Sequence, residues 1–387
     1  DAAERHWGPE ARERLVVRHR LQPFAGDYFR PPSGTGRPGL FSYAAQHRVR
    51  LTGDGAPRPF LDAEALAETV PQDTVSLSDL VFAWTNPSRF VIGRRLKVSL
   101  ALDEAALQDD EPVALDGLGQ FKVRQAVLDG LLDGLPEATL CERLLRSGLL
   151  PGGAPGVAWL RQAIEAVAPV ATAVRAWGTT NPRPVEVAVE GARVLGTVER
   201  VCDRGALRYR AGSVREKDLV AAWVDHLALS ASGVARTCTL GTTDSCHFEA
   251  LDAEDARMLL QCLVRGYHVI LRTVPPLFER ASYTYADKLS GAQRQAWTDR
   301  VLQRERAAAG LGDGRHNGAP EVNGWAMQQA RKAFDGGFGR DGDRSDAYVA
   351  LATRGRDPFR DDARVVHQWA ACLWAPLLEN RRPGLPA

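Results

Sequence analysis

The spacing of apolar residues changes along the chain and predicts helices first, then strands, then helices again. Ser76 precedes a set of apolar residues over 77–84 that share one helical face, and helical spacing returns over 118–150 and 157–177. Pro87 should end the first helix, because the residue before a proline avoids helical geometry. We expect a second helix to follow through Phe90, Val91 and Leu96.

Further along the chain, apolar residues begin to recur at every second position. From 185 to 189, valines alternate with polar or small residues, which predicts a β-strand. In order, we predict a strand at 185–189, a turn at 190–191, a strand at 194–198, a turn at 203–205, a strand at 207–210 and a helix at about 217–228. The predicted fold class is therefore α/β, with a small mixed sheet flanked by helices and with additional helical regions.

The remaining stretches suggest how the chain is organised. Residues 1–75 have little periodicity and are rich in Pro and Gly, with a loop predicted at 31–39, so we expect the tail of a preceding domain and a linker. The start at Asp1 leads us to expect a cut inside a longer protein. Residues 76–387 are expected to form one domain, with a helical lead-in at 76–180, a strand core and helix at 185–235, and a helical part at 250–387.

Composition narrows the function classes. Of the 387 residues, 44% are hydrophobic and 25% charged, which is typical of a globular protein. No apolar run approaches the ~20 residues that span a bilayer, and the N-terminal residues do not resemble a signal peptide. The six cysteines include no C-x-x-C pair, so we expect reduced, buried thiols in a cytoplasmic protein without membrane contact.

A zinc site is the one metal alternative that the cysteines suggest. Cys238 and Cys246 could join His226 and His247 in such a site, although their spacing matches no common zinc finger. We therefore expect no bound metal and no cofactor.

The basic residues are nearly all arginine. The net charge is only +1, so the chain as a whole is not a polycation. Arginine can hold a phosphate with two parallel hydrogen bonds, which suits a nucleic-acid-binding protein. A coding bias that favours arginine would produce the same composition. Both explanations stay open on composition alone. The five lysines are Lys97, Lys122, Lys217, Lys288 and Lys332.

Residues 194–228 resemble the core of the PD-(D/E)xK nuclease fold, in which strand, turn, strand and helix follow in this order. In active members, Gly-x-x-Asp on one strand supplies a carboxylate for the metal, and (Asp/Glu)-x-Lys follows on the next strand. Both side chains of the second motif share a face because strand side chains alternate. Carboxylate oxygens are suitable ligands for Mg²⁺, and the metal generates the attacking hydroxide.

This chain departs from the second of those motifs. The first element reads Gly196-Thr197-Val198-Glu199, in which Glu199 stands for the aspartate. The second falls on Arg208-Tyr209-Arg210, with Arg208 at the carboxylate position and Arg210 at the lysine position. A guanidinium has no lone pair to offer and repels a divalent cation. The sequence therefore predicts a nuclease-like core that is catalytically inactive, with no catalytic residue.

Other interpretations of this stretch stay open. Residues 194–228 could be a simple meander and helix with the arginines on a solvated face. An active nuclease could instead use Glu199 with a distant acid such as Asp203 or Asp218. If guanidinium groups replaced the metal, the site could hold backbone phosphates without cutting them. The DNA-binding candidates are Arg200, Arg204, Arg208, Arg210 and Arg215.

Beyond this motif, several blocks over residues 21–235 resemble, in order, the C-terminal third of the RecC family. RecC is the gamma chain of bacterial exodeoxyribonuclease V, the RecBCD helicase–nuclease. No block is diagnostic alone, but six in register are hard to obtain by chance. The blocks read LQPF at 21–24, LSDL at 77–80 with FAWTNPSRF at 82–90 and RRL at 94–96, EP at 111–112 with LDGL at 115–118, GALRYR at 205–210, WVDHL at 223–227 and ASG at 231–233.

The resemblance implies a role in double-strand break repair and homologous recombination. Members of the family bind the RecB and RecD subunits, receive duplex DNA and help to split it at a fork, and their nuclease-like domain lacks nuclease activity. Residues 1–75 would then be the tail of a helicase-like domain. The sequence contains no ATP-binding G-x-x-x-x-G-K-[ST] loop, which fits a part without motor activity. A docking module that never touches DNA is the remaining alternative.

Two further features could contact nucleic acid. Trp297 and Trp325 lie in polar stretches and are candidates for stacking on bases, whereas the other tryptophans sit at apolar helical spacing. The Gly-, Asp- and Arg-rich segment at 310–345 could be a phosphate-contacting loop or a plain surface loop. It includes Arg315, Arg331, Lys332, Arg340 and Arg344.

Overall fold

The computed structural model divides the chain into two units, Asp1–Arg58 and Pro59–Ala387. The first unit contains α1 (Ala2–Trp7), α2 (Ala11–Leu15) and the short 3₁₀ helix η1 (Gly26–Phe29). The loop expected at 31–39 lies outside the described residues, and so do residues 67–72, just before the boundary expected at 75, which stays a prediction. The structure describes residues 2–22, 25–29, 41–43, 59–61, 66, 73–100, 114–233, 237–309, 321–337 and 341–385.

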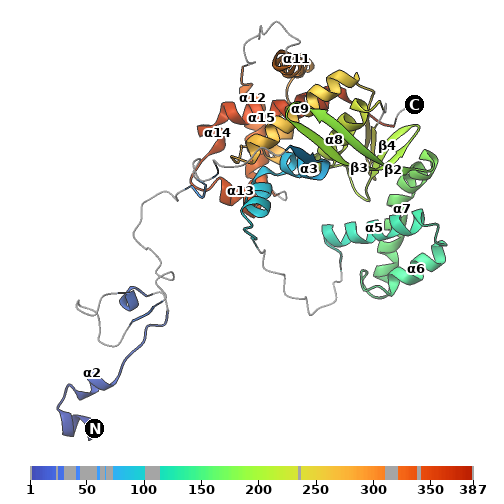
Figure 1. Cartoon of the computed structure of the whole chain (residues 1–387). Coiled ribbons are helices and arrows are strands. Elements are labelled where there is room, and N and C mark those ends of the chain that lie inside the picture. The colour runs from blue at the N-terminus through green and yellow to red at the C-terminus, as the bar shows by residue number, and fades with distance from the viewer. Residues whose placement is uncertain are drawn as a thin grey trace. The chain divides into compact units, whose positions relative to one another are not determined.

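The second unit is built on a mixed sheet, which confirms the coarse α/β prediction (Figure 1). Strands β1 and β3 pair in parallel, as do β4 and β5, and the other neighbours pair antiparallel. The order among the described residues is β1-β3-β4-β5-β6-β7, with β2 paired to β3. The strands are β1 (Thr74–Ser76), β2 (Asn181–Val189), β3 (Ala192–Cys202), β4 (Gly205–Tyr209), β5 (Thr237–Leu240), β6 (Ser245–Phe248) and β7 (Arg381–Pro383).

The three predicted strands are confirmed as β2, β3 and β4, with turns where the sequence places them. Val189 pairs with Ala192 across the first turn, where Gly191 has a positive φ of 75°. The sequence does not predict β5 and β6, because each has only four residues and β5 is buried at every position. Neither strand therefore shows a long alternation of apolar and polar residues. Strand β7 lies in the part predicted as helical.

The helices surround the sheet. The predicted first helix begins after Ser76, whose Oγ accepts a hydrogen bond from the Asp79 N–H at 3.0 Å. It ends at Thr85, and the expected second helix is a single turn from Pro87 followed by π-helical turns. The helices are α3 (Leu77–Thr85), α4 (Pro87–Arg89), η4 (Phe90–Arg95), α5 (Gly117–Leu132), α6 (Glu137–Leu145), α7 (Gly153–Trp177), α8 (Glu216–Ala231), α9 (Ala253–Ile270), α10 (Glu279–Asp287), α11 (Gly291–Ala308), α12 (Gly324–Asp335), η5 (Asp343–Ser345), α13 (Ala347–Ala352), α14 (Pro358–Asp361) and α15 (Ala363–Asn380).

Each face of the sheet has its own hydrophobic cluster. Helices α3, α8, α9 and α15 pack on one face together with side chains of β2, β3 and β6. Helices α5, α6 and α7 pack on the other face against Leu207 of β4 and Cys238 and Leu240 of β5. Adjacent residues Ala206 and Leu207 belong to opposite clusters, as the period of two along a strand requires.

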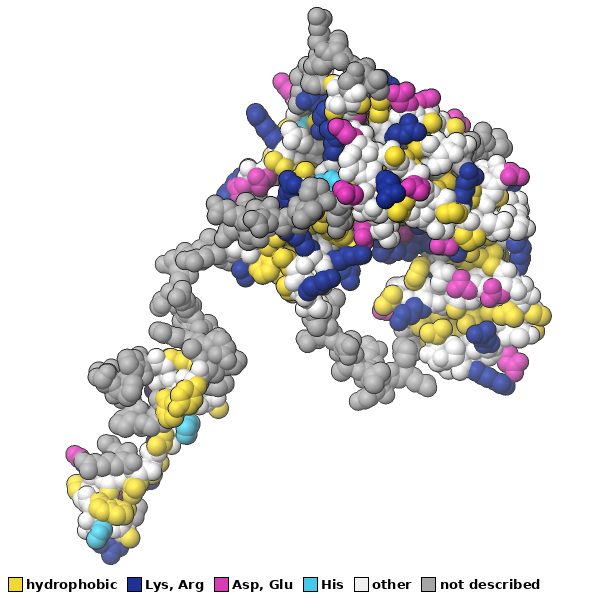
Figure 2. Space-filling model, in the orientation of Figure 1, with side chains coloured by type: hydrophobic (Ala, Val, Ile, Leu, Met, Phe, Trp, Pro, Cys, Tyr) yellow, Lys and Arg dark blue, Asp and Glu magenta, His cyan; other side chains and the backbone are white. Residues whose placement is uncertain are grey.

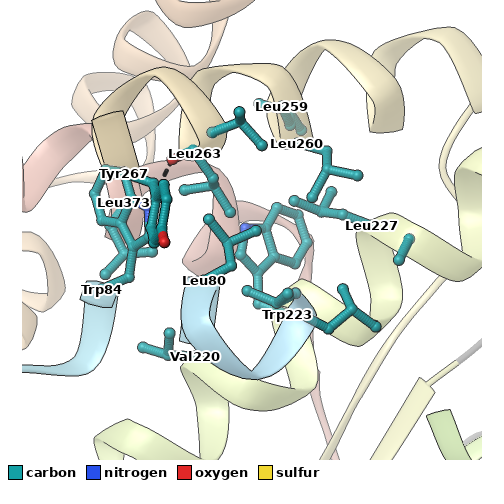
Figure 3. Close-up of a cluster of buried hydrophobic side chains, with 14 of the residues drawn as sticks. Leu80, Trp84, Val220, Trp223, Leu227, Leu259, Leu260, Leu263, Tyr267 and Leu373 are labelled. Atoms are coloured by element: carbon teal, nitrogen blue, oxygen red, sulfur yellow. Dashed lines mark hydrogen bonds between the residues drawn. The ribbon is translucent and has the colours of Figure 1, made fainter. Parts of the chain in front are cut away.

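The centre of the larger cluster lies between α3, α8 and α9 (Figure 3). Leu80 and Trp84 of α3 point toward Trp223 of α8 and toward Leu263 and Tyr267 of α9. The indole N–H of Trp84 donates to the Leu263 carbonyl oxygen at 2.8 Å. The residues that carry the 77–90 and 223–227 family blocks therefore build the core rather than an exposed surface.

A third cluster joins side chains of α10, α11, α12, α13, α14 and α15. Trp297 is buried in this cluster, so its proposed role as an accessible stacking platform is wrong. Trp325 at the start of α12 is exposed. Helix α12 forms within the segment expected at 310–345 to be a loop, while 310–320 and 338–340, including Arg315 and Arg340, lie outside the described residues. No helix in the described part of the chain combines the length and apolar character that crossing a membrane requires.

Candidate functional site

The nuclease-like motif falls on two adjacent antiparallel strands and the helix that follows them. Gly196 and Glu199 lie on β3, and Arg208 lies on β4. A Cβ atom at Gly196 would approach the Leu77 side chain to 2.8 Å, so α3 packs closely against β3 at this point. Val201 pairs with Ala206, and continuing this register by two residues places Glu199 opposite Arg208.

Arg208 forms an ion pair with Asp225 in the middle of α8. Arg208 Nε donates to Asp225 Oδ2 at 2.7 Å. The Arg208 side chain is 42% exposed, whereas that of Asp225 is 5% exposed. Burial raises the pKa of Asp225 and the nearby negative charge of Glu199 adds to this effect, while Arg208 opposes it. The guanidinium therefore compensates a buried carboxylate.

Arg210 lies one residue beyond β4 and is held at the start of α8. It donates to the Asp218 carboxylate, which also accepts the Arg215 backbone N–H at 2.9 Å. Arg215 Nε lies 3.5 Å from the same carboxylate oxygen. The Arg210 guanidinium lies over the Phe121 ring, and its side chain is only 13% exposed.

Two of the arginines expected to join this group lie on the opposite face of the sheet. Arg200 stacks over the Tyr209 ring at 4.5 Å from its centroid, and Arg204 stacks over Trp177 at 4.8 Å. Tyr209 and Trp177 pack with the α5–α7 cluster, because Tyr209 follows Arg208 directly and points the other way. The expected alternation of Arg208 and Arg210 against Leu207 and Tyr209 is confirmed, but a single group of five arginines is wrong. Only Arg215 joins Arg208 and Arg210 on the α8 face.

The donor set on this face does not suit a metal ion. Asp225 is paired with Arg208, Asp218 with Arg210 and Arg215, and Asp203 is exposed in the turn before β4. Across the described residues, no group of three or more His, Cys, Asp and Glu side chains is placed to hold a metal ion.

The residues of the alternative zinc site make other contacts instead. His226 Nδ1 lies 3.2 Å from Thr237 Oγ1, and His247 Nδ1 lies 2.9 Å from the Gly384 carbonyl oxygen. Burial raises the pKa of the Cys238 thiol to about 12, which disfavours the thiolate that zinc needs. Cys238 and Cys246 also belong to clusters on opposite faces of the sheet.

Sequence reasoning missed Asp225, which is the central acid of the site. The one signal available is its position, because Asp225 is the one acidic residue in the run from Leu219 to Leu229 of α8, which is apolar apart from Asp225 and His226. A charged residue on an apolar helical face predicts a buried partner of opposite sign.

The surface shows the same balance of charges. On the face drawn in Figure 2, Lys and Arg side chains are interspersed with Asp and Glu and do not merge into one basic patch. Many of the arginines described have an acidic partner close by, such as Arg94 with Asp79 and Arg294 with Glu379. Phosphate contacts on such a surface would have to compete with these pairs.

Comparison with known proteins places the chain among the RecC proteins. It is 29% identical over 214 residues to the RecBCD enzyme subunit RecC of Escherichia coli strain K12, a match that covers 54% of this chain and 18% of that protein. It is 27% identical over 386 residues to the same subunit of Mycolicibacterium smegmatis, which covers 95% of this chain and 33% of that protein. The chain thus spans about a fifth to a third of the length of these relatives.

The match with the family itself covers the site and every strand of the sheet described here except β7. The RecC C-terminal domain family aligns with residues 72–290, which extend from β1 to the end of α10 and contain Glu199, Arg208 and Asp225. The chain therefore belongs to the RecC C-terminal domain family.

Proposed function

We propose that the chain is a non-catalytic scaffold and DNA-fork-binding portion of a RecC-type subunit. It would act within an exodeoxyribonuclease V (RecBCD) complex in double-strand break repair and homologous recombination, beside RecB and RecD subunits and in contact with duplex and forked DNA. Support comes from the family match and from relatives that are RecC subunits of RecBCD enzymes.

The single observation that carries the non-catalytic role is the Arg208–Asp225 pair. In a PD-(D/E)xK nuclease-like core, β3 would supply Glu199 and β4 would supply a second carboxylate to a metal. Here β4 supplies a guanidinium instead, and this guanidinium neutralises the nearest buried acid. Divalent metals need oxygen ligands with available lone pairs. The Arg208–Asp225 ion pair would therefore stand where an active nuclease holds its metal ion. The opposite charges of the two side chains balance each other there.

The DNA-contacting role rests on arginines around this core. Arg208 and Arg215 keep part of their guanidinium groups exposed on the α8 face, and Arg200 and Arg204 are exposed on the other face. Arg210 is the least exposed of the five and contributes mainly by fixing the start of α8. Contacts of this type would hold backbone phosphates and carry no sequence preference.

We expect Arg208→Gln combined with Arg210→Gln to weaken binding of forked DNA without changing sequence preference. The salt dependence of binding should lose about one unit of slope, at ~0.9 per phosphate contact, because Arg208 is the more exposed of the two and Arg210 mainly fixes the start of α8. Fluorescence anisotropy of forked and blunt duplexes across a salt series measures this, with affinities referred to the folded fraction. Arg146→Gln, at the residue that follows α6, is the matched control, because Arg146 is exposed and paired with Glu142 but remote in sequence from the motif.

A docking module without DNA contact is favoured by one specific observation, the pairing of Arg208, Arg210 and Arg215 with acids of α8. If the folded double variant binds forked DNA as the unmodified chain does, these arginines only hold the fold. Binding to RecB and RecD subunits in a pull-down, with no measurable DNA binding, would then identify docking as the function.

A further inference from the structure

A pocket of about 380 Å³ lies outside the motif described above and shares no residue with it. Its walls come from α3, α9, α11 and α15, and they include the aromatic rings of Trp84 and Trp369. Two cysteines line it, Cys262 from α9 and Cys372 from α15. Cys372 also lines a neighbouring pocket of about 180 Å³.

The two sulfurs are close enough to react with each other. The Sγ atoms of Cys262 and Cys372 lie 3.0 Å apart, although the residues are 110 positions apart in the sequence. A disulfide bond of ~2.05 Å needs the sulfurs to approach by about 1 Å more. Cys262 is buried, whereas Cys372 is partly exposed. Both residues line the larger pocket, and Cys372 is the more exposed of the two.

A positive charge is fixed beside these sulfurs. Arg304 Nη2 lies 3.3 Å from Cys262 Sγ and 3.1 Å from Glu305 Oε1. The Glu305 side chain is 0% exposed and is itself held by Gln261 Nε2 at 3.2 Å and by Arg265 Nε at 3.3 Å. The buried Glu305 carboxylate thus holds the guanidinium of Arg304 beside the Cys262 thiol.

This arrangement separates the acidities of the two thiols. The hydrogen bond with Cys262 lowers the pKa of Cys372, and the charge of Arg304 lowers it further against the opposing effect of burial. The hydrogen bond with Cys372 and burial both raise the pKa of Cys262. The thiolate is the nucleophilic form of cysteine, and Cys372 is the more exposed of the two residues, so Cys372 is the sulfur that attacks and Cys262 the one that follows.

We propose that Cys262 and Cys372 form a redox-active dithiol, a modification site that a hydroperoxide converts reversibly into an intramolecular disulfide between α9 and α15. The Cys372 thiolate attacks the nearer oxygen of hydrogen peroxide, the O–O bond breaks, and hydroxide leaves and takes up a proton as water. The Cys262 sulfur then attacks the Cys372 sulfenic acid, loses its proton, and releases a second water. Two thiols supply the two electrons that reduce one peroxide to two waters.

The other cysteines offer internal comparisons. Cys141 and Cys202 are partly exposed. Cys238 and Cys246 are buried, and burial raises the pKa of both thiols. Selective oxidation at 262 and 372 therefore distinguishes the proposed site from general reactivity of thiols.

To test this, the full chain is treated with a small excess of hydrogen peroxide. The remaining thiols are then alkylated, and the peptides are mapped by mass spectrometry without reduction. We expect the intact mass to fall by about 2 Da through loss of two hydrogens. A peptide linked through 262 and 372 should appear, and dithiothreitol should remove it. Cys141→Ser with Cys202→Ser should form the same link at the same rate.

Two further variants test the assigned roles. Cys262→Ala should leave Cys372 as a sulfenic acid that a 1,3-diketone probe labels, and Arg304→Gln should slow formation of the link several-fold while Arg304→Lys slows it less. Circular dichroism confirms that each variant is folded. The proposal is overturned if peroxide consumes Cys141 or Cys202 before Cys372, if the link forms between chains, or if no 262–372 link forms in the folded protein.

Discussion

Replacing Trp84 by alanine is expected to lower the free energy of unfolding by about 3–5 kcal/mol, the usual loss for a large aromatic residue in a core. Trp84 is fully buried, it donates a hydrogen bond to the Leu263 carbonyl oxygen, and it contacts the ring of Trp369. Its removal leaves a cavity where α3, α9 and α15 meet and leaves that carbonyl without its indole partner. Urea denaturation followed by circular dichroism measures the loss.

Gly266→Ala offers a complementary test of the same contact. A Cβ atom at Gly266 would lie 2.2 Å from Trp84 Cζ2, so the methyl group must displace the indole. Overpacking of this kind costs about 1–3 kcal/mol. Trp84→Phe keeps the ring volume more nearly and should lose less than Trp84→Ala. A loss below about 1 kcal/mol in Trp84→Ala would contradict the central position of this residue in the core.

Arg208→Ala is expected to lower the free energy of unfolding by about 1–3 kcal/mol at neutral pH. Removing one partner of a buried ion pair costs about 3–5 kcal/mol, and the 42% exposure of Arg208 reduces this figure through solvent screening. The cause is Asp225, which would remain buried without its guanidinium partner. Thermal and urea unfolding of the variant and the unmodified chain measure the difference.

The pH dependence of that difference has a definite sign. Burial raises the pKa of folded Asp225, so its ionisation opposes folding, and loss of Arg208 raises this pKa further. The destabilisation should therefore be largest at neutral pH and shrink as the pH falls and Asp225 becomes protonated. Asp225→Asn added to Arg208→Ala should recover most of the loss. If the double variant is no more stable than Arg208→Ala, the pair is not the source of the effect.

The sequence predicts the central strands well, and the reason is their alternation. Strands β2, β3 and β4 each have enough residues for the period of two to be visible, and the turns between them are short. The same alternation predicts that Arg208 and Arg210 share a face. The family blocks predict the core for a different reason, because Trp84 and Trp223 are large apolar side chains whose packing constrains the sequence around them.

The partners of the arginines could not be predicted in the same way. Asp225 lies 17 residues after Arg208 and meets it only because α8 packs back over the sheet. Arg200 was expected beside Arg208. The pairing of β2 with β3 is irregular between Val198 and Val201, next to Arg200. Arg200 stacks on the Tyr209 ring instead. The cysteine pair joins residues 262 and 372, a contact without any local signal.

A cleavage assay on linear duplex and forked DNA with Mg²⁺ or Mn²⁺ tests most directly whether the chain is non-catalytic. Because Arg208 is paired to Asp225 where a metal-binding carboxylate would lie, we expect the isolated chain to leave both substrates intact at every metal concentration. Degradation that requires the metal and disappears in Glu199→Ala would contradict it, because Glu199 would then be a working ligand of a nuclease.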